Sequence, residues 1–173
     1  MNLKSMTYIS LMSVIITLCA WLTIPSAVPF TMQTFGIFFA LLFLGGKKGT
    51  VSIGVYLLLG ALGLPVFSGF SGGMGHLFGI TGGYMLGFLL TGIVYMVFEH
   101  LFGKSLKTSV ISLILGLLLC YVFGTVWFSI YKGNMSILKA FAVCVMPFII
   151  PDLLKLSLAV IIYKRLKKAS ESN

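Results

Sequence analysis

Asp152 and Lys155 are the residues of this sequence whose types and spacing could do chemistry. They lie in the apolar stretch VMPFIIPDLLKLSLAVIIY, residues 145–163, and Asp152 is the only aspartate of the chain. An ionised side chain at the centre of a bilayer costs roughly 2.5–3.5 kcal/mol. Residues spaced i, i+3 face the same side of a helix. We therefore expect the pair to bind a substrate; the alternative is an internal ion pair that holds this helix to its neighbours.

The composition predicts an integral membrane protein. Hydrophobic residues make up 59% of the 173 positions and charged residues 9%, with a mean hydropathy of +1.12. Residues 5–46 and 49–98 contain no Lys, Arg, Asp or Glu, and each stretch is long enough for two spans of about 20 residues. No period-2 alternation points to a barrel, so an all-α bundle is expected.

Apolar runs, separated by charged or Pro/Gly-rich breaks, predict a single integral membrane domain over residues 1–173 with six transmembrane helices. The second and third predicted spans are short for a bilayer crossing. The expected spans are 7–24, 31–44, 50–64, 79–98, 108–130 and 137–163.

The basic residues predict the orientation of these spans. With the N- and C-termini in the cytoplasm, most basic side chains are cytoplasmic and only Lys132 and Lys139 lie outside, which satisfies the positive-inside rule. The net charge of +9 therefore reflects the orientation of a multi-pass membrane protein and indicates no nucleic-acid partner. The membrane is expected to be a bacterial plasma membrane. The run KRLKK, residues 164–168, is expected to contact anionic membrane lipid. The residues predicted to be cytoplasmic are Lys4, Lys47, Lys48, Lys104, Lys107, Lys164, Arg165, Lys167 and Lys168.

The depth of the charged pair follows from the rise of a helix. Lys155 precedes Lys164 by nine residues, which places it about 13–14 Å above the inner boundary, near the midplane of a core roughly 30 Å thick. Pro147 and Pro151 disfavour a smooth helix just before the pair. Pro151 suits the first turn of a restarted helix, where Asp152 would meet the positive end of the helix dipole. Broken helices with polar groups at mid-depth are typical of transporter substrate sites.

Two uncharged outer connections, residues 25–36 and 65–84, are rich in Gly, Pro, Ser, Thr and aromatic residues. The second is longer than most structureless loops, and its glycines permit a close approach to a small ligand; the alternative is a simple connector. No phosphate-binding GxxxxGK[ST] motif is present. Gln33 and Tyr84 add polar groups at the outer ends of two spans, although each could serve packing or an interfacial belt. Together with the charged pair they would suit a neutral polar head, such as a ureido ring, plus an anionic group.

Four blocks in order, VPFTMQTFG, LLLGALGLPVFSGFSGGMG, GITGGYMLGF and PFIIPDLLK, strongly resemble the BioY family, the biotin-binding S-components of energy-coupling factor (ECF) transporters. The resemblance covers nearly the whole chain. It implies a six-helix subunit that captures extracellular biotin with high affinity. It also implies assembly with a transmembrane coupling subunit and two ABC-type ATPases, which supply the energy. This sequence departs from the family pattern at Ile80, where proline is usual, and at Ile150, where IPD replaces PGD.

The resemblance also implies which residues bind biotin. Asp152 and Lys155 occupy the family's D-x-x-K position, with Asp152 accepting hydrogen bonds, Lys155 donating to an oxygen and Gln33 completing the polar set. Which end of biotin meets Lys155 stays open, because the ureido oxygen and the carboxylate both accept hydrogen bonds. The remaining residues expected to contact or enclose biotin are Phe30, Gly72, Gly73, Met74, His76, Thr81 and Tyr84.

Ser10, Ser13 and Thr17 form a small-residue stripe along the first predicted helix, which lets another helix approach closely. The resemblance implies that this stripe docks on the coupling subunit; packing within the bundle is the alternative.

Two rival functions remain. An ion-coupled transporter working alone could use the charged pair as a proton relay. An intramembrane enzyme is disfavoured because no Ser–His dyad and no metal-ligand set stands in register. Cys19, Cys120 and Cys144 lie in separate apolar segments and are interpreted as packing residues. We expect a transporter subunit, not an enzyme, with no metal and no cofactor.

Overall fold

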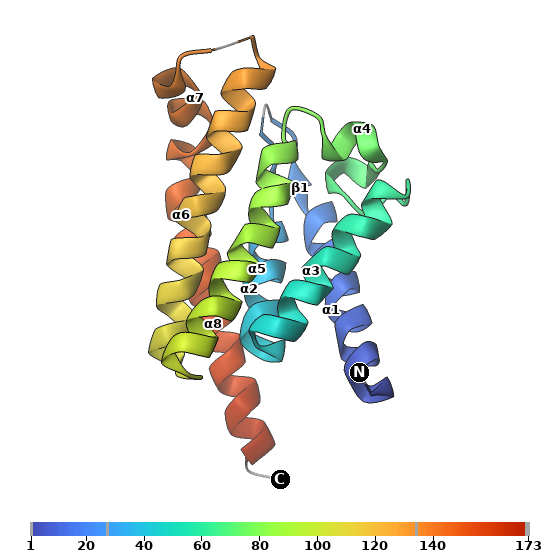
Figure 1. The fold of residues 1–173 in the computed structure, drawn as a ribbon, viewed down its shortest axis with the longest axis vertical. Helices are drawn as coiled ribbons and strands as arrows, with labels where there is room; N and C mark the ends of the chain where they lie inside the picture. Colours follow the sequence, from blue (N-terminus) through green and yellow to red (C-terminus); the bar gives the residue numbers. More distant parts are fainter. Residues whose placement is uncertain (1, 27, 134, 172–173) are drawn as a thin grey trace.

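The computed structural model describes residues 2–26, 28–133 and 135–171, which form a helical bundle with a small hairpin (Figure 1). Both termini lie at one end of the bundle, and α4 and α7 lie at the other, which we call the outer end. In the described part of the chain the helices are α1 (Leu3–Trp21), α2 (Gln33–Leu44), α3 (Gly46–Ala61), α4 (Met74–Leu77), α5 (Gly82–Phe102), α6 (Leu106–Tyr131), α7 (Ile137–Cys144) and α8 (Met146–Glu171). The strands are β1 (Thr23–Ile24) and β2 (Phe30–Thr31), and η1 (Ser68–Phe70) is a 3₁₀ helix.

The all-α prediction is confirmed. Four helices of the described chain are long and apolar enough to cross a membrane: α1, α5, α6 and residues Met146–Ala169 of α8. The second and third predicted spans correspond to α2 and α3, which have 12 and 16 residues. At 1.5 Å per residue α2 is about 18 Å long, well short of a core roughly 30 Å thick.

The predicted sixth span, 137–163, is two helices rather than one. The break falls at Val145, whose backbone leaves the helical region with φ −122° and ψ −51°. The expected restart at Pro151 is wrong, because α8 begins at Met146 and Pro147 occupies its first turn, where a missing N–H costs nothing. Pro151 lies inside α8. Asp152 is therefore beyond the first turn and does not meet the positive end of the helix dipole.

A one-residue turn joins α2 to α3. Gly45 adopts φ +77°, a conformation that glycine reaches without strain. Glu99 of α5 stabilises the turn, because its Oε2 accepts a hydrogen bond of 2.7 Å from the N–H of Gly46 at the start of α3. The predicted cytoplasmic loop before Thr50 is thus mostly helix.

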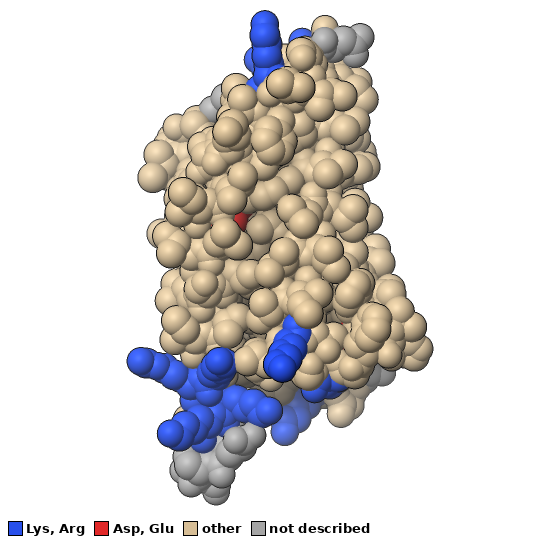
Figure 2. All heavy atoms as spheres, turned by 90° about the vertical axis from the view of Figure 1, so that its left-hand side faces the viewer, with Lys and Arg blue, Asp and Glu red and all other residues tan. Residues whose placement is uncertain are grey.

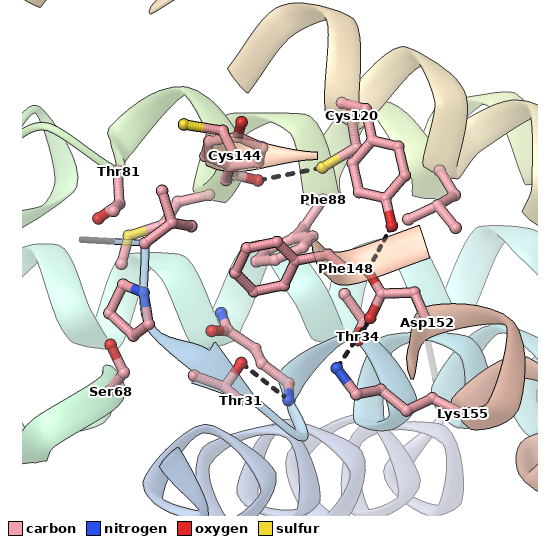
Figure 3. A pocket seen from close by; sticks show the side chains of 17 residues that line it. Thr31, Thr34, Ser68, Thr81, Phe88, Cys120, Cys144, Phe148, Asp152 and Lys155 are labelled. Atoms are coloured by element: carbon pink, nitrogen blue, oxygen red, sulfur yellow. Dashed lines mark hydrogen bonds and ion pairs between the residues drawn. The ribbon is translucent and has the colours of Figure 1, made fainter. Parts of the chain in front are cut away.

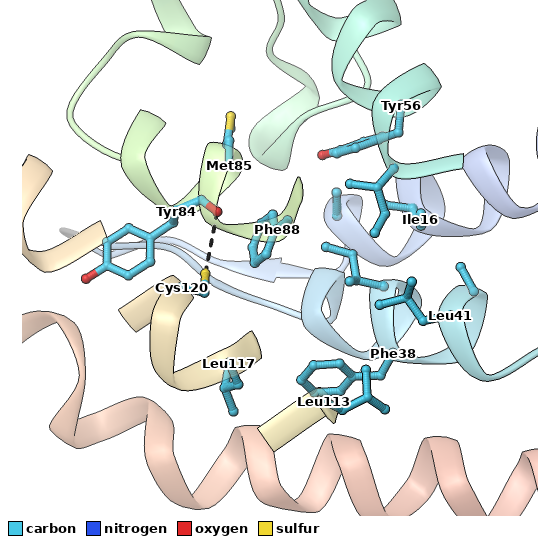
Figure 4. Close-up of a cluster of buried hydrophobic side chains, with 14 of the residues drawn as sticks. Ile16, Phe38, Leu41, Tyr56, Tyr84, Met85, Phe88, Leu113, Leu117 and Cys120 are labelled. Carbon is cyan, nitrogen blue, oxygen red and sulfur yellow. Dashed lines mark hydrogen bonds between the residues drawn. The ribbon is translucent and has the colours of Figure 1, made fainter. Parts of the chain in front are cut away.

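Glycines bring α5 and α6 into close contact. A Cβ on Gly83 would lie 2.3 Å from the Cβ of Trp127, and one on Gly116 would lie 2.9 Å from the Cα of Thr91. The Thr91 hydroxyl donates a hydrogen bond of 2.9 Å across this interface to the Gly116 carbonyl. Small residues that allow such approach are typical of packed membrane helices. Figure 4 shows the apolar core that α5 and α6 build with α1, α2 and α3.

The two outer connections were expected to be irregular, and this prediction is wrong in part. The strands β1 and β2 pair as an antiparallel hairpin between α1 and α2, with Thr23 opposite Thr31. The glycine-rich segment 65–81 contains η1 and α4. It is attached to the bundle by Trp21 and Trp127, whose indole N–H groups each donate a hydrogen bond of 2.9 Å, to the carbonyls of Pro65 and Gly79.

Charge is segregated along the bundle. Figure 2 shows lysine and arginine side chains gathered at the end that carries the termini, with a few at the outer end and almost no charge between them. This distribution matches the cytoplasmic cluster expected from the sequence.

Candidate functional site

A cavity of about 70 Å³ lies under the hairpin and the glycine-rich segment, smaller than the roughly 300–1,000 Å³ that is usual for small-molecule sites. Its walls come from the hairpin, α2, α5, α6 and the region of the α7–α8 break, and Ser68 and Thr81 of the outer segment also line it (Figure 3). The lining residues are Val28, Pro29, Thr31, Gln33, Thr34, Ser68, Thr81, Tyr84, Met85, Phe88, Leu117, Cys120, Tyr121, Cys144, Phe148, Asp152 and Lys155.

Asp152 and Lys155 form a buried ion pair at the base of this cavity. Their exposed fractions are 3% and 5%, and Lys155 Nζ lies 2.8 Å from Asp152 Oδ1. The same ammonium group lies 4.4 Å from the centre of the Phe30 ring, a cation–π distance. A buried charge needs a partner and hydrogen bonds. Asp152 and Lys155 are partners of each other, and the further hydrogen bonds to Asp152 come from side chains that also line the cavity.

Two hydroxyl groups complete the surroundings of Asp152 (Figure 3). Thr34 donates a hydrogen bond of 2.8 Å to Oδ1, and Tyr121 donates one of 2.6 Å to Oδ2. Neither residue was predicted from the sequence. Thr34 directly follows Gln33, so a pair of polar residues at the start of α2 was a usable signal, but nothing near Tyr121 distinguishes it from a packing tyrosine. Both position the carboxylate, which in turn positions Lys155.

Gln33 is linked to the outer segment by a column of aromatic rings. Its Nε2 donates a hydrogen bond of 2.9 Å to the Tyr56 hydroxyl. The Tyr56 ring meets Phe67 edge to face at 5.5 Å, and Phe67 stacks on His76 at 5.4 Å. Phe67 fits against α3 because residue 60 is glycine, where a Cβ would lie 2.0 Å from the Phe67 ring. A polar wall residue of the cavity is thus connected to α4.

Comparison with known proteins places this architecture in a family. The sequence profile of the BioY family matches residues 1–172. The chain belongs to the BioY family. The resemblance inferred from the four sequence blocks is confirmed.

Several BioY relatives match over most of their length. The chain is 42% identical over 140 residues to a probable biotin transporter BioY of Pyrococcus horikoshii, which covers 81% of each chain. It is 40% identical over 155 residues to the biotin transporter BioY of Thermotoga maritima, which covers 89% of this chain and 90% of that one. A crystal structure of the S-component for biotin from an ECF-type ABC transporter superposes with a TM-score of 0.85 at 31% identity, covering 95% of this chain and 91% of the other. The ECF S-component fold is therefore established for this chain.

The residues assigned to the site by the BioY resemblance fall into two groups. Asp152, Lys155, Gln33, Tyr84 and Thr81 line the cavity. The others lie around it: Phe30 contacts Lys155, and Gly72, Gly73, Met74 and His76 belong to the outer segment above the cavity without lining it.

The small-residue stripe of α1 is partly buried in the bundle and partly exposed. Ser13 and Thr17 are buried, and the Ser13 hydroxyl donates a hydrogen bond of 2.9 Å to the carbonyl of Ser52 in α3. These two residues thus pack inside the bundle, as expected under the alternative of internal packing. Ser10 is exposed, so in this conformation it alone of the three is accessible to a coupling subunit.

The three cysteines are buried and free. Cys120 and Cys144 line the cavity, which the interpretation as simple packing residues did not include. Among the described residues there is no cluster of metal-ligating side chains.

His76 gives the outer segment a predicted dependence on pH. Burial lowers the pKa of His76 below its usual value of 6.5, since desolvation disfavours the charged ring. The unfolded chain then binds the proton more readily, so the stability contributed by neutral His76 is present above about pH 6.5 and is lost as the pH falls below it. We expect the thermal midpoint of the wild type to drop more between pH 7.5 and 5.5 than that of His76→Gln. Equal drops in the two proteins would contradict this.

Proposed function

We propose that this chain captures biotin from outside the cell as the substrate-binding subunit of an ATP-driven ECF transporter. The observation that carries the proposal is the buried Asp152–Lys155 pair at the base of a cavity, in a chain that belongs to the BioY family. The relatives named as biotin transporters and the similar S-component for biotin support the choice of ligand.

The polar groups of the cavity suit the chemistry of biotin. Lys155 uses one of its three N–H donors on Asp152, which leaves two for a ligand oxygen. Asp152 accepts three hydrogen bonds out of about four that a carboxylate can accept, which leaves one position for a ligand N–H. A ureido ring offers both N–H donors and a carbonyl acceptor, and a valerate carboxylate offers further acceptors. Apolar walls such as Met85, Phe88 and Leu117 suit the remaining hydrocarbon and thioether surface.

The residues of the site have two roles: some bind or enclose biotin, and others cover it. Asp152, Lys155 and Gln33 bind its polar groups, with Thr81, Tyr84 and Phe30 completing the walls. The segment containing Gly72, Gly73, Met74 and His76 covers the ligand from the outer end. Gly73 adopts φ +92°, a conformation that a side-chain-bearing residue rarely adopts.

The same proposal covers the topology of the chain, its partner subunits and its membrane. The chain spans the membrane six times, with α7 and α8 together as the sixth span and both termini in the cytoplasm. A transmembrane coupling subunit and two ABC-type ATPases supply the energy, and α1 with Ser10 contributes to docking. The membrane is a cell membrane, expected from the sequence to be bacterial; relatives come from Pyrococcus horikoshii, an archaeon, as well as from Thermotoga maritima.

Titration calorimetry of the purified chain with biotin tests the proposal. We expect about one biotin to bind per chain, without the ATPases and without an ion gradient. An absence of binding by a folded, monodisperse preparation would overturn the function.

The rival ion-coupled transporter is tested in vesicles. We expect vesicles that contain only this chain to show no biotin uptake driven by a proton or sodium gradient, and uptake to appear when the coupling subunit and ATPases are added with ATP. Uptake driven by the gradient alone would favour the rival.

A further inference from the structure

A second cleft lies at the end of the bundle that carries the termini, and it is lined on one side by lysines. Lys164, Lys167 and Lys168 come from the last turns of α8, and Lys104 comes from the α5–α6 connection. Segments about sixty residues apart in the sequence thus bring four cations to one cleft, which we call the basic cleft. The other basic residues at this end, including Lys4 and Lys48, do not line it.

Among the described residues that line the basic cleft, one carboxylate, that of Glu99, faces these cations, and it already has partners. Glu99 Oε2 accepts the hydrogen bond from the Gly46 N–H, and Oε1 lies 3.6 Å from Lys104 Nζ. Even without Lys167, the lining lysines Lys104, Lys164 and Lys168 outnumber this glutamate, so positive charge is in excess in the basic cleft. Coulomb repulsion among like charges is reduced when an anion binds between them, so the cleft favours an anionic ligand.

The rest of the lining of the basic cleft is of two kinds. Tyr95, Ser105 and Ser109 contribute hydroxyl groups, and Tyr95 donates a hydrogen bond of 2.8 Å to Ser109. Leu42, Phe43 and Leu44 at the end of α2 contribute apolar surface, and Phe43 is 42% exposed. A ligand that fills this cleft therefore has an anionic group beside the lysines and apolar surface beside Phe43.

The position of the basic cleft along the bundle identifies the ligand class. The apolar run of α8 ends at Tyr163 and is followed directly by KRLKK, residues 164–168, so these lysines lie where a membrane helix leaves the hydrocarbon, at the level of lipid phosphates. We propose that the basic cleft is a binding site for one anionic phospholipid of the phosphatidylglycerol type, with its phosphate between Lys164, Lys168 and Lys104 and an acyl chain along Phe43. This goes beyond the general attraction of basic residues to an anionic surface, because it assigns one lipid to one site.

Competition between lipids in nanodiscs or mild detergent, read by native mass spectrometry, tests the site. The probe is phosphatidylglycerol titrated into phosphatidylcholine. The cleft variant is Lys164→Gln with Lys168→Gln, and the matched control is Lys4→Gln with Lys48→Gln, which removes the same charge at the same end of the bundle. We expect the wild type to retain one phosphatidylglycerol, the cleft variant to bind it on the order of tenfold more weakly, and the control to change by less than about twofold, since screening weakens exposed charges beyond about 8–10 Å.

Other outcomes overturn the proposal. Equal losses in the two double variants would mean that only the overall charge matters. Displacement of the lipid by inorganic phosphate at millimolar concentration would indicate a site for a soluble anion, and tighter binding of an acidic peptide than of the lipid would indicate a protein partner. A thermal midpoint raised by phosphatidylglycerol in the wild type and control, but not in the cleft variant, supports the site independently of mass spectrometry.

Discussion

Lys155→Ala should bind biotin at least about tenfold more weakly than the wild-type chain, with a loss of up to about 150-fold. Hydrogen bonds to charged groups are worth about 1.5–3 kcal/mol, and about 1.4 kcal/mol corresponds to a factor of ten in affinity. The variant removes the two ligand-facing donors of Lys155 and leaves Asp152 with only the Thr34 and Tyr121 hydroxyls. Titration calorimetry of the purified proteins measures the change.

The matched control for this prediction is Lys132→Ala, which removes an exposed lysine at the outer end of α6. We expect it to bind biotin as the wild type does. Asp152→Asn, which removes the anion and keeps the side-chain shape, should also weaken binding because it no longer holds Lys155 by charge. Unchanged affinity in both Lys155→Ala and Asp152→Asn would contradict the assignment of the site, and the ion pair would then have a packing role only.

Gly83→Ala should lower the thermal stability of the whole bundle. The added Cβ would lie 2.3 Å from the Cβ of Trp127 and 3.2 Å from the Cα of Gly124, neither of which is the flexible end of a side chain. The helices α5 and α6 would have to separate, and such overpacking costs about 1–3 kcal/mol. Thermal unfolding in detergent, followed by circular dichroism, measures the effect.

Gly54→Ala in α3 is the control for the packing argument. A Cβ at Gly54 meets no atom within 4 Å, so this substitution should be neutral or stabilising by about 0.5–1 kcal/mol, the usual difference between glycine and alanine within a helix. If both alanine variants changed stability in the same direction by similar amounts, backbone propensity rather than contact between α5 and α6 would explain the result.

Much of the architecture follows from the physics of the bilayer. Uncharged stretches of the required length predicted the long helices α1, α5 and α6, because backbone polar groups in lipid must be paired within a helix. The same reasoning identified Asp152 and Lys155 from a single sequence, since ionised residues are rare at that depth. Their ion pair, at 2.8 Å, follows from the spacing i, i+3 on a helix.

Other features depend on contacts that a local pattern does not contain. The partnership of Tyr121 with Asp152 joins residues 31 positions apart, and neither segment carries a sign of the other. The helix breaks at Val145 and not before Pro151, because Pro147 is tolerated in the first turn of α8. Pro151 lies inside α8 and does not end it. The buried position of Ser13 depends on a carbonyl of α3, which the spacing of small residues in α1 does not reveal.

Both tryptophans of the chain contact the segment that covers the cavity. Trp21 lies 4.9 Å from the Phe70 ring and binds the Pro65 carbonyl, while Trp127 lies 6.4 Å from the Phe78 ring and binds the Gly79 carbonyl. With two tryptophans in the sequence, the tryptophan fluorescence of the unlabelled protein originates entirely at the attachments of this segment. We therefore expect tryptophan emission intensity and quenching to report any movement of this segment over the cavity in real time, without an introduced dye.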